Sequence, residues 1–329
     1  MYKCPHYQEC GGCSLQHLPY EAQLEAKKAK LEDALGHGAP SIAVVPSKPW
    51  GYRNRVSLHA LRSNTFPRCG FKARKSDTVI PIGDCPVAVD GIRHLLPRLL
   101  PPPGKDRFTL YCKDSTLIAE TGTSCSGGGK APENIPDRGT ISLAGREITL
   151  EASSFFQSNA GAQESLIAEL GKAAAKTAGI AGGPGTMADL YCGVGALSLF
   201  LADLYPGGAD LVEEDARAVE LAKINLAKTS NPGKCHFYPK KVEQWLKKRN
   251  LGCYSAIVAD PPRQGLSPVL VLSLCNSGPP MFVYISCEAA TFARDYRLLA
   301  GKYYAESLYL FDFYPQTLHI ETMGIFIRK

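Results

Sequence analysis

The chain has 329 residues and a net charge of +6, and with 45% hydrophobic and 21% charged residues it is long enough for two cores. No apolar run approaches the roughly 20 residues that a membrane helix needs, and the first residues lack the apolar segment of a signal peptide. We therefore expect a cytoplasmic protein, whose 12 cysteines stay reduced and serve as ligands, nucleophiles or buried side chains.

The N-terminal segment is rich in cysteine and has the composition of turns. Cys4, Cys10 and Cys13 are separated by five and two residues, and neighbouring glycines permit a tight turn. Three thiolates at this spacing can face one metal centre, and our candidate for the fourth ligand is Cys85. Four cysteines suit either an iron–sulfur cluster or structural zinc, so the residues alone leave both open.

A helix is predicted over Glu21–Leu35, where apolar positions recur in a segment rich in Ala, Lys and Glu. From Ser41 to Leu150, short β-like stretches alternate with turns, which predicts a small antiparallel β domain. Cys69 and Cys112 lie in this part and compete with Cys85 as ligands, although burial explains both equally well. The β-like stretches are residues 56–61, 79–82, 108–111, 141–143 and 148–150.

The positive charge is concentrated in residues 1–100, which hold 14 Lys and Arg against 8 Asp and Glu, whereas the remainder holds 23 of each. Lys48–Lys75 contains no acidic residue, and aromatic residues are interleaved with its basic ones. Such a stretch suits phosphate contacts and base stacking, which predicts binding to a nucleic acid. The alternative is a solvated sheet edge with protective charges. The basic residues are Lys48, Arg53, Arg55, Arg62, Arg68, Lys72, Arg74 and Lys75.

After Ser153 the pattern changes to short apolar runs separated by helical segments, beginning with a helix over Ala160–Ala178. Because the runs are apolar throughout, they are typical of strands buried on both faces, and the alternation predicts a parallel, doubly wound α/β sheet. The runs are residues 187–191, 209–212, 256–259 and 282–286.

The ends of these predicted strands carry the features of a ligand-binding edge. Asp189–Gly195 precedes a predicted helix at Ala196–Leu204, and its glycines allow a ligand to approach the backbone closely. Glu213 follows about twenty residues later, where a carboxylate can accept hydrogen bonds from both ribose hydroxyls. Two prolines in Asp260–Arg263 hold Asp260 at the same edge. NAD-binding folds share this spacing, so the cofactor depends on the rest of the site.

A thiol and a carboxylate complete the predicted site. Carbon 5 of uracil reacts with a methyl donor only after a nucleophile has added to carbon 6, and a thiolate such as Cys287 suits that addition. A base must then remove the proton from carbon 5. We expect His319 and Glu321 to lie two apart on one strand and to share a face. Taken singly, Cys287 is more often a buried small residue and Glu321 a surface charge, but with the donor site they predict methylation of a pyrimidine carbon.

Five motifs, in this order along the chain, resemble those of the RNA (uracil-5-)-methyltransferase family. The resemblance covers nearly the whole chain, and it implies a C-terminal Rossmann-like class I methyltransferase domain of α/β type beside a smaller, mainly antiparallel β domain that binds iron–sulfur. The motifs are Phe155–Asn159, Asp189–Gly195, Asp260–Gly265, Ile285–Cys287 and His319–Glu321.

The same resemblance implies S-adenosylmethionine as the methyl donor, with Cys287 as the nucleophile and Glu321 as the general base. Two positions depart from the family pattern. Ala196 stands where some members carry an asparagine near the donor, and Lys240–Glu243 stands about where an acidic residue is expected near the adenine. The residues implied to bind the donor are Gln157, Tyr191, Glu213 and Asp260.

The cysteine pattern is similar to that of the family branch that carries a [4Fe–4S] cluster, so we favour a cluster over zinc at Cys4, Cys10, Cys13 and Cys85. Members of this branch often carry an N-terminal β-barrel, the TRAM barrel, that binds RNA. Since only three residues precede Cys4, we expect this barrel to be absent. The branch favours 23S ribosomal RNA as the substrate, with transfer RNA second, and we expect a monomer.

We assign residues 1–20 and 50–152 to a cysteine-ligated, β-rich RNA-binding domain. Residues 21–49 and 153–329 are assigned to the methyltransferase domain with its N-terminal helix. Two other interpretations stay open. An amino-group methyltransferase, which carries a similar Asp-Pro-Pro motif, would need neither Cys287 nor Glu321. A non-catalytic, metal-stabilised RNA-binding protein would bind RNA without regard to the donor.

Overall fold

The computed structural model describes residues 4–61, 65–127, 130–178, 185–247 and 249–329, and these form two compact units. The first unit comprises the described residues of Met1–Gln23, Ser47–Gln163 and Phe313–Leu318. The second comprises those of Leu24–Pro46, Glu164–Asp312 and His319–Lys329. Arg62, one of the basic residues named above, lies outside the described residues. None of the described helices combines the length and apolar character needed to cross a membrane.

The first unit includes residues 153–163 and 313–318, which the sequence analysis assigned to the methyltransferase domain. Hydrogen bonds explain this grouping, because the Asn54 amide donates to the Ser158 carbonyl at 2.9 Å and the Asn159 side chain donates to the Phe313 carbonyl at 3.1 Å. The ring of Phe156 also meets the Tyr111 ring edge-on, with centroids 5.8 Å apart. The chain therefore stays in the first unit from Ser47 through Gln163 and returns to it once more near the C-terminus, at Phe313–Leu318.

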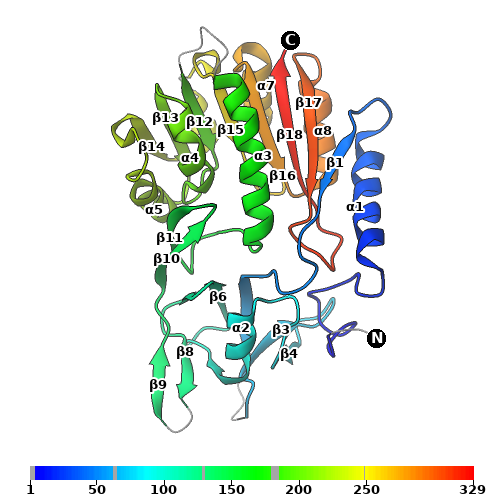
Figure 1. The fold of residues 1–329 in the computed structure, drawn as a ribbon, viewed down its shortest axis with the longest axis vertical. Helices are drawn as coiled ribbons and strands as arrows, with labels where there is room; N and C mark the ends of the chain where they lie inside the picture. Colours follow the sequence, from blue (N-terminus) through cyan, green and yellow to red (C-terminus); the bar gives the residue numbers. More distant parts are fainter. Residues whose placement is uncertain (1–3, 62–64, 128–129, 179–184, 248) are drawn as a thin grey trace. The chain divides into compact units, whose positions relative to one another are not determined.

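The predicted helices at Glu21–Leu35 and Ala160–Ala178 are confirmed as α1 and α3 (Figure 1). The helix predicted after the glycine turn forms α4 and then continues as a 3₁₀ turn over Ala202–Leu204. The helices are α1 (Tyr20–Leu35), α2 (Asp90–Leu95), α3 (Ala160–Ala178), α4 (Ala196–Leu201), α5 (Ala216–Leu226), α6 (Val242–Leu246), α7 (Pro268–Ser277) and α8 (Ala289–Leu299).

One mixed sheet forms the centre of the second unit and runs in the order β1-β17-β18-β16-β15-β12-β13-β14. The four predicted apolar runs are its strands β12, β13, β15 and β16, which lie parallel to one another. The predicted parallel sheet is thus confirmed for these four strands, but the whole sheet is mixed, because β18 runs antiparallel to both β16 and β17. The strands are β1 (Ile42–Val45), β12 (Thr186–Leu190), β13 (Gly208–Glu213), β14 (Cys235–Pro239), β15 (Ala256–Ala259), β16 (Met281–Ser286), β17 (Tyr303–Phe311) and β18 (Glu321–Arg328).

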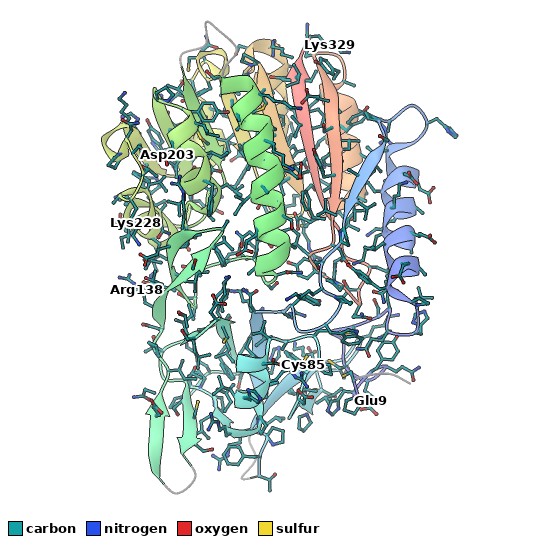
Figure 2. All side chains as sticks on the ribbon, in the orientation of Figure 1. Glu9, Cys85, Arg138, Asp203, Lys228 and Lys329 are labelled. Carbon is teal, nitrogen blue, oxygen red and sulfur yellow. The ribbon has the colours of Figure 1, made fainter. Side chains whose placement is uncertain are left out.

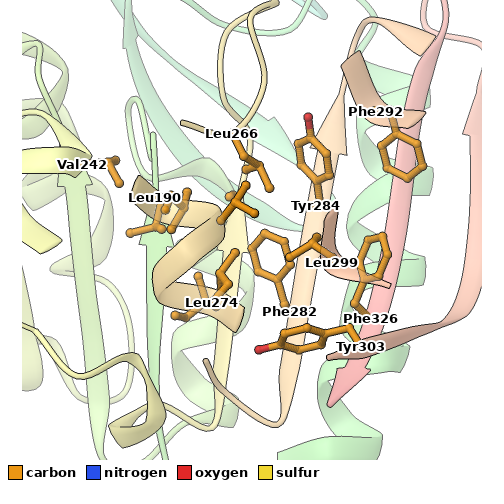
Figure 3. Close-up of a cluster of buried hydrophobic side chains, with 14 of the residues drawn as sticks. Leu190, Val242, Leu266, Leu274, Phe282, Tyr284, Phe292, Leu299, Tyr303 and Phe326 are labelled. Carbon is orange, nitrogen blue, oxygen red and sulfur yellow. The ribbon is translucent and has the colours of Figure 1, made fainter. Parts of the chain in front are cut away.

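Helices cover both faces of this sheet, as the buried runs predict. In Figure 1 α3 crosses one face. Apolar residues of α1, α6, α7 and α8 form one buried cluster with strand residues of the other face. Aromatic rings dominate this cluster (Figure 3): the Tyr284 ring stacks on Phe292 at 5.2 Å, and Phe282 lies 6.1 Å from Phe326. Burial of such large rings contributes to the stability of this unit.

The first unit contains antiparallel sheets, as predicted. The order of the largest is β4-β3-β2-β6-β7, and α2 contributes Ile92 and Leu95 to the core that this sheet covers. Cys69 and Cys112 are buried in that core. The strands are β2 (Arg55–Ala60), β3 (Cys69–Lys72), β4 (Val79–Pro81), β5 (Leu99–Leu100), β6 (Arg107–Lys113), β7 (Thr116–Ala119), β8 (Ser124–Gly127), β9 (Lys130–Asn134), β10 (Arg138–Leu143) and β11 (Arg146–Glu151).

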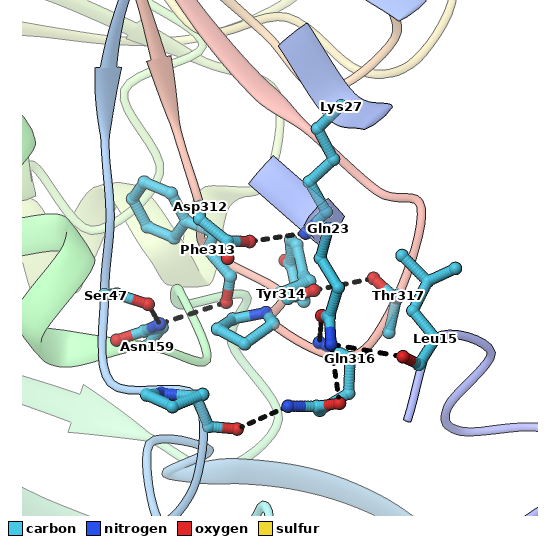
Figure 4. Close-up of polar contacts among 12 residues, drawn as sticks. Leu15, Gln23, Lys27, Ser47, Asn159, Asp312, Phe313, Tyr314, Gln316 and Thr317 are labelled. Carbon is cyan, nitrogen blue, oxygen red and sulfur yellow. Dashed lines mark hydrogen bonds and ion pairs between the residues drawn. The ribbon is translucent and has the colours of Figure 1, made fainter. Parts of the chain in front are cut away.

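Gln316 organises the segment that leads from β17 toward β18 (Figure 4). Its backbone adopts a positive φ of 67°, its amide donates to the Gln23 side chain at 2.9 Å, and its carbonyl accepts from Ser14 and Leu15 at 2.8 and 3.0 Å. The Gln316 side chain accepts from Gln23 and donates to the Pro49 carbonyl. Because these polar groups are buried, each needs such a partner, and together they fix the segment in one conformation.

Candidate active site

The residues predicted for chemistry lie at the carboxyl ends of parallel strands in the second unit. Tyr191 follows β12, Glu213 ends β13, Asp260 follows β15 and Cys287 follows β16. Because these strands run in the same direction, their ends meet at one edge of the sheet, where open α/β folds bind ligands. Glu321 begins the antiparallel strand β18.

The register of β16 and β18 brings the thiol and the carboxylate together. The ladder ends at the pair Ser286–Thr322, and Cys287 and Glu321 are the next residues along, close enough for the Glu321 charge to raise the pKa of Cys287. The Glu321 side chain is buried, and the Cys287 thiol is half-buried. This antiparallel pairing joins two segments that are more than thirty residues apart in the chain.

Burial and like charge govern the ionisation of this group. Burial raises the pKa of Asp260 to about 6, and burial together with the Asp260 charge raises the pKa of Glu321 well above its ordinary value. The pKa of Cys287 is raised by burial, then by Glu321 and Asp260, whereas the cation of Arg263 lowers it. The Cys287 thiol therefore holds its proton more tightly than an exposed thiol, and the Arg263 cation partly opposes this effect by favouring the thiolate.

The glycine turn after β12 is built for close approach of a ligand. Tyr191 and Gly193 have positive φ values of 63° and 53°, and Gly195, at 76°, has no room for a side chain because a Cβ would lie 2.8 Å from Leu226. The Gly193 amide donates to Glu213 at 3.1 Å. Glu213 is thus held by the turn, and its second oxygen accepts from the Asp215 amide at 2.9 Å. Each carboxylate oxygen keeps lone pairs for a ligand hydroxyl.

Asp189 is a site residue that the sequence analysis quoted within a motif but did not select. Ser198 donates to one oxygen of its buried carboxylate at 2.6 Å, and the other oxygen has no hydrogen-bond partner among the described residues. Burial, with a further effect of Asp260, raises the pKa of Asp189 to about 7. The signal in the sequence was an acidic residue inside an otherwise apolar strand, which is costly to bury unless a ligand or partner uses it.

The expectation that His319 and Glu321 share the face of one strand is wrong. β18 begins at Glu321, so His319 precedes the strand, and it is exposed whereas Glu321 is buried. The Leu318–Ile320 stretch is apolar enough to suggest a strand, but it is the approach to β18 and follows the segment that Gln316 fixes. Glu321 is therefore a buried carboxylate at the start of β18, whereas His319 is exposed and lies before that strand.

Gln157, the remaining residue predicted to bind the donor, belongs to the first unit. Its side-chain oxygen is buried and has no hydrogen-bond partner within the described structure. A buried acceptor without a partner is costly, so a donor from a ligand is the natural complement. The role of Gln157 in binding the donor stays a prediction.

The two departures from the family pattern also have defined places. Ala196 is the first residue of α4 and is buried. The amide of Lys240 donates to the Glu213 carbonyl at 2.9 Å, and Lys241 lies 3.9 Å from Glu214. Burial raises the pKa of the Tyr191 hydroxyl, and Glu243 on α6 adds to that rise, so this segment does supply an acidic side chain near Tyr191.

The four predicted metal ligands lie in the first unit, where Figure 2 labels Cys85 among its side chains. Burial raises the pKa of each of Cys10, Cys13 and Cys85, with smaller effects of Cys4 on Cys10 and of Cys13 on Cys85, so the thiols are neighbours. Within the described part of the chain, however, no group of three or more His, Cys, Asp or Glu side chains is arranged to hold a metal ion. The predicted ligand set is therefore not confirmed.

Backbone contacts hold the cysteine segment against the basic stretch. The Gly11 amide donates to the Lys72 carbonyl at 3.0 Å, the Arg74 amide donates to the Glu9 carbonyl at 2.8 Å, and the Arg74 guanidinium donates to the Cys13 carbonyl at 2.6 Å. The competing cysteines are explained by burial, which raises the pKa of Cys69 to about 12. The stretch from Lys48 to Lys75 therefore supports the cysteine segment.

Exposed aromatic rings beside cations favour a nucleic-acid surface in the first unit. Phe155 is 66% exposed with the Arg55 guanidinium 5.8 Å from its ring centroid, and Phe66 is 45% exposed with Arg68 at 5.0 Å. Exposed apolar rings that already stack on guanidinium groups are typical stacking platforms for bases.

Two family models match the second half of the chain. One is described as "Methyltransferase small domain" and covers residues 175–269, and the other as "tRNA (Uracil-5-)-methyltransferase" and covers residues 240–329. The latter contains the Asp-Pro-Pro turn, Cys287 and Glu321. The chain also shares the fold of Pyrococcus abyssi tRNA (uracil-54, C5)-methyltransferase, solved with S-adenosyl-L-homocysteine, with 23% identity, a TM-score of 0.74, and coverage of 96% of this chain and 86% of that one.

Relatives along the full length carry the same kind of name. A Treponema denticola protein named "Uncharacterized RNA methyltransferase" is 32% identical over 361 residues, which cover 99% of this chain and 83% of the relative. A Thermosynechococcus vestitus protein of the same description is 28% identical, with coverage of 98% and 83%. Together with the matched uracil-5 model, this similarity shows that the chain is an RNA methyltransferase and belongs to the RNA (uracil-5-)-methyltransferase family.

Proposed function

We propose that the protein transfers a methyl group from S-adenosylmethionine to carbon 5 of a uridine in RNA, with Cys287 as nucleophile and Glu321 as general base. The observation that carries this proposal is the pairing of β16 with β18, which brings Cys287 close to Glu321 at the edge that also holds Asp260. An amino-group methyltransferase needs no thiol at this point, and a non-catalytic RNA-binding protein needs no buried carboxylate close to it.

The residues at the sheet edge suit the proposed donor. The glycine turn allows close approach, Glu213 keeps lone pairs for the ribose hydroxyls, and Asp189 has a buried oxygen without a partner for a cationic group. Gln157, from the first unit, offers a further acceptor. S-adenosylmethionine, when bound, supplies an electrophilic methyl group on a sulfonium. Asp260, whose pKa burial raises, is stabilised as an anion by such a positive charge.

The chemistry assigns one task to each side chain. The Cys287 thiolate forms a bond to carbon 6, and the electrons of the 5,6 double bond become available at carbon 5, which takes the methyl group. Glu321 then removes the carbon 5 proton, the double bond forms again, and the bond from sulfur to carbon 6 breaks. The raised pKa of Glu321 makes its carboxylate a stronger base than an exposed one, while Arg263 favours the thiolate.

Trapping the covalent adduct tests this mechanism. RNA with 5-fluorouridine at the target carries no removable proton, so the wild-type protein should remain linked to it on a denaturing gel. Cys287→Ala should abolish both the adduct and methylation. Glu321→Gln should transfer the methyl group once and then accumulate linked to normal methylated RNA, because elimination needs the base. Methylation by Cys287→Ala would overturn the proposal.

For the substrate we propose 23S ribosomal RNA, with transfer RNA as the alternative. The cysteine pattern supports the former, and the name of the matched family model supports the latter. Mapping 5-methyluridine in ribosomal and transfer RNA from cells with and without the gene distinguishes the two. Loss of the mark from transfer RNA alone would replace the first proposal by the second.

We also propose that Cys4, Cys10, Cys13 and Cys85 bind a [4Fe–4S] cluster, with zinc as the alternative. The neighbouring thiols and the fixed backbone of the cysteine segment support this, although the side chains as placed do not form a ligand group. Protein purified anaerobically should contain iron and absorb broadly in the visible range, and Cys10→Ser should lose both properties. Colourless protein with stoichiometric zinc would favour the alternative, and metal-free protein would overturn the site.

A further inference from the structure

One buried carboxylate, Asp295, lies outside the reacting group but bonds to the segments beside it. This residue lies on α8 and is completely buried, so it makes no contact with solvent. One of its oxygens accepts from the Leu266 amide at 2.9 Å and from the Tyr284 hydroxyl at 2.8 Å. The other accepts from the Arg294 guanidinium at 2.8 Å. A buried carboxylate is retained only when such donors satisfy it.

These partners belong to the two segments that carry the chemistry. Leu266 ends the turn that begins at Asp260, and the amide that it donates is buried. Tyr284 lies on β16, three residues before Cys287. A single carboxylate oxygen therefore joins the turn that presents Asp260 to the strand that presents the nucleophile. The ladder between β15 and β16 ends at the pair Ala259–Tyr284, one residue before Asp260, and the Asp295 bonds extend this connection to the far end of the turn.

Other side chains of α8 hold the same turn. The Thr291 hydroxyl donates to the Arg263 carbonyl at 3.1 Å, and Arg294 donates to the Gln264 carbonyl at 2.9 Å. The next residue of the turn, Gly265, has a φ of 77°, and a Cβ there would lie 2.2 Å from Thr291 and 2.5 Å from Asp295. The turn thus lies directly on α8, so closely that only glycine fits.

We propose that Asp295, together with Arg294, is a positioning residue that sets the placement of the Asp260–Leu266 turn relative to Cys287. This inference rests on the proposed function, because the distance from the Asp260 turn to Cys287 matters only if Cys287 reacts beside a bound donor. Methyl transfer needs the thiol, the target carbon and the donor in one geometry, and a displacement of about 1 Å at such a site can reduce the rate about a hundredfold. Arg263, which favours the thiolate, moves with the same turn.

Asp295→Asn removes the interaction of Asp295 with Arg294 and keeps its other hydrogen bonds. The amide oxygen can still accept from Leu266 and Tyr284, but the amide nitrogen cannot accept from Arg294. We expect kcat to fall at least about tenfold, as a displaced turn would cause, with the KM for RNA changed less than about twofold. Tyr284→Phe removes only the hydrogen bond from β16 to Asp295 and should lower kcat about threefold or more. This second variant still tests the proposal if Asp295→Asn does not fold.

Asp210→Asn is the matched control. Asp210, on β13, is another buried aspartate; it accepts from the Tyr254 hydroxyl at 2.6 Å and pairs with Arg249 at 3.5 Å, but it bonds to no residue of the turn. Both variants should lower the Tm, whereas only Asp295→Asn should lower kcat. Equal loss of kcat in the two variants would overturn the positioning role and leave a general loss of stability.

Hydrogen exchange separates this inference from the proposed function. In Asp295→Asn and Tyr284→Phe, the amides of residues 263–266 should exchange at least about tenfold faster than in the wild type, whether or not the wild type methylates uridine. If the wild type forms no adduct with 5-fluorouridine RNA, the proposed function fails while faster exchange still supports the connection. Unchanged exchange, or faster exchange with wild-type kcat in an active enzyme, would overturn the positioning role.

Discussion

Buried carboxylates gather at the carboxyl edge of the sheet in the second unit. Burial raises the pKa values of Asp189, Asp260 and Glu321, and their mutual charge adds to the effect for each pair that interacts. A protein without a ligand gains no stability from this arrangement, because each ionised carboxylate is held away from water. The proposed function accounts for the arrangement, because a cationic donor and a general base would both use negative charge at this edge.

Asp189 gives a prediction about the pH dependence of stability. Its pKa is about 7 in the folded chain, against about 3.9 in an unfolded one, so the folded state binds the proton more tightly. Its contribution to stability is therefore complete below about pH 4 and is lost as the pH rises to about 7. Asp189→Asn, which cannot ionise, should gain in Tm relative to the wild type between about pH 5 and about pH 8.

The measurement is thermal unfolding of both proteins without donor across this range. The control is Asp203→Asn, an aspartate that accepts from the Ser230 amide at 2.8 Å away from this edge. Its Tm difference from the wild type should stay constant with pH. A constant difference for Asp189→Asn as well would show that this carboxyl is not destabilised by its burial.

At the scale of elements, α1 is held by polar side chains inside the protein. Lys27 is fully buried and forms an ion pair with the fully buried Asp312 in the second unit, and Gln23 bonds to Gln316 in the first (Figure 4). Burial lowers the pKa of Lys27, and Asp312 opposes that effect. The helix therefore depends for its place on specific partners as well as on apolar contacts of Leu31 and Leu35.

Removal of one partner of the Lys27–Asp312 pair should destabilise the protein far more than replacement of both partners by apolar residues. Lys27→Met leaves the Asp312 carboxylate buried without its cation, and we expect a loss of about 3–5 kcal/mol in the free energy of unfolding. The double variant Lys27→Met with Asp312→Leu removes both charges and should recover most of that loss, because the desolvation penalty disappears with them. Denaturant unfolding measures both values.

The neighbouring Lys28 is the control for a charge on the same helix. It is exposed and lies 3.5 Å from Glu32 one turn later, so Lys28→Met should change the free energy of unfolding by less than about 0.5 kcal/mol. A double variant no more stable than Lys27→Met alone would mean that Asp312 has other essential partners.

At the scale of the whole molecule, the basic stretch and the reacting group belong to different units. Several basic side chains of that stretch have partners inside the protein: Lys72 pairs with Asp77, and Arg74 bonds to the Cys13 carbonyl. Such residues support the fold of the first unit. Lys48 and Lys75 are exposed and therefore better placed to contact phosphate.

We predict that the double variant Lys48→Ala with Lys75→Ala binds RNA more weakly and with a flatter salt dependence. Loss of two phosphate contacts should reduce the slope of log K against log salt by about 1–2. Tm and donor affinity should stay unchanged, because neither lysine is among the residues proposed to bind the donor. Filter binding or fluorescence anisotropy over a salt titration measures the slope.

The control is Lys172→Ala on α3, an exposed lysine of the second unit that pairs with Glu169 at 2.7 Å. It should leave the salt slope as in the wild type. An unchanged slope in the double variant would assign the exposed lysines to a solvated edge, and RNA contact would then depend on the aromatic and guanidinium pairs near Phe66 and Phe155.

Much of the site could be predicted because its residues follow directly from local patterns. A buried parallel strand is a short apolar run, and the residue after it lies at the carboxyl edge wherever the strand sits in the sheet. Tyr191, Glu213, Asp260 and Cys287 were found in this way. The helices at α1 and α3 were predicted from composition and periodicity for the same reason, since helical hydrogen bonds are local.

Contacts between distant segments were decided only by the tertiary structure. Nothing local shows that β18 runs antiparallel beside β16, so the closeness of Cys287 and Glu321, and the start of β18 after His319, were decided by the sheet. The burial of Lys27 against Asp312 and the bonds of Asp295 to Leu266 and Tyr284 likewise join residues from separate elements. Sequence patterns report which side chains are apolar, whereas the partner of a buried polar group is set by which elements pack together.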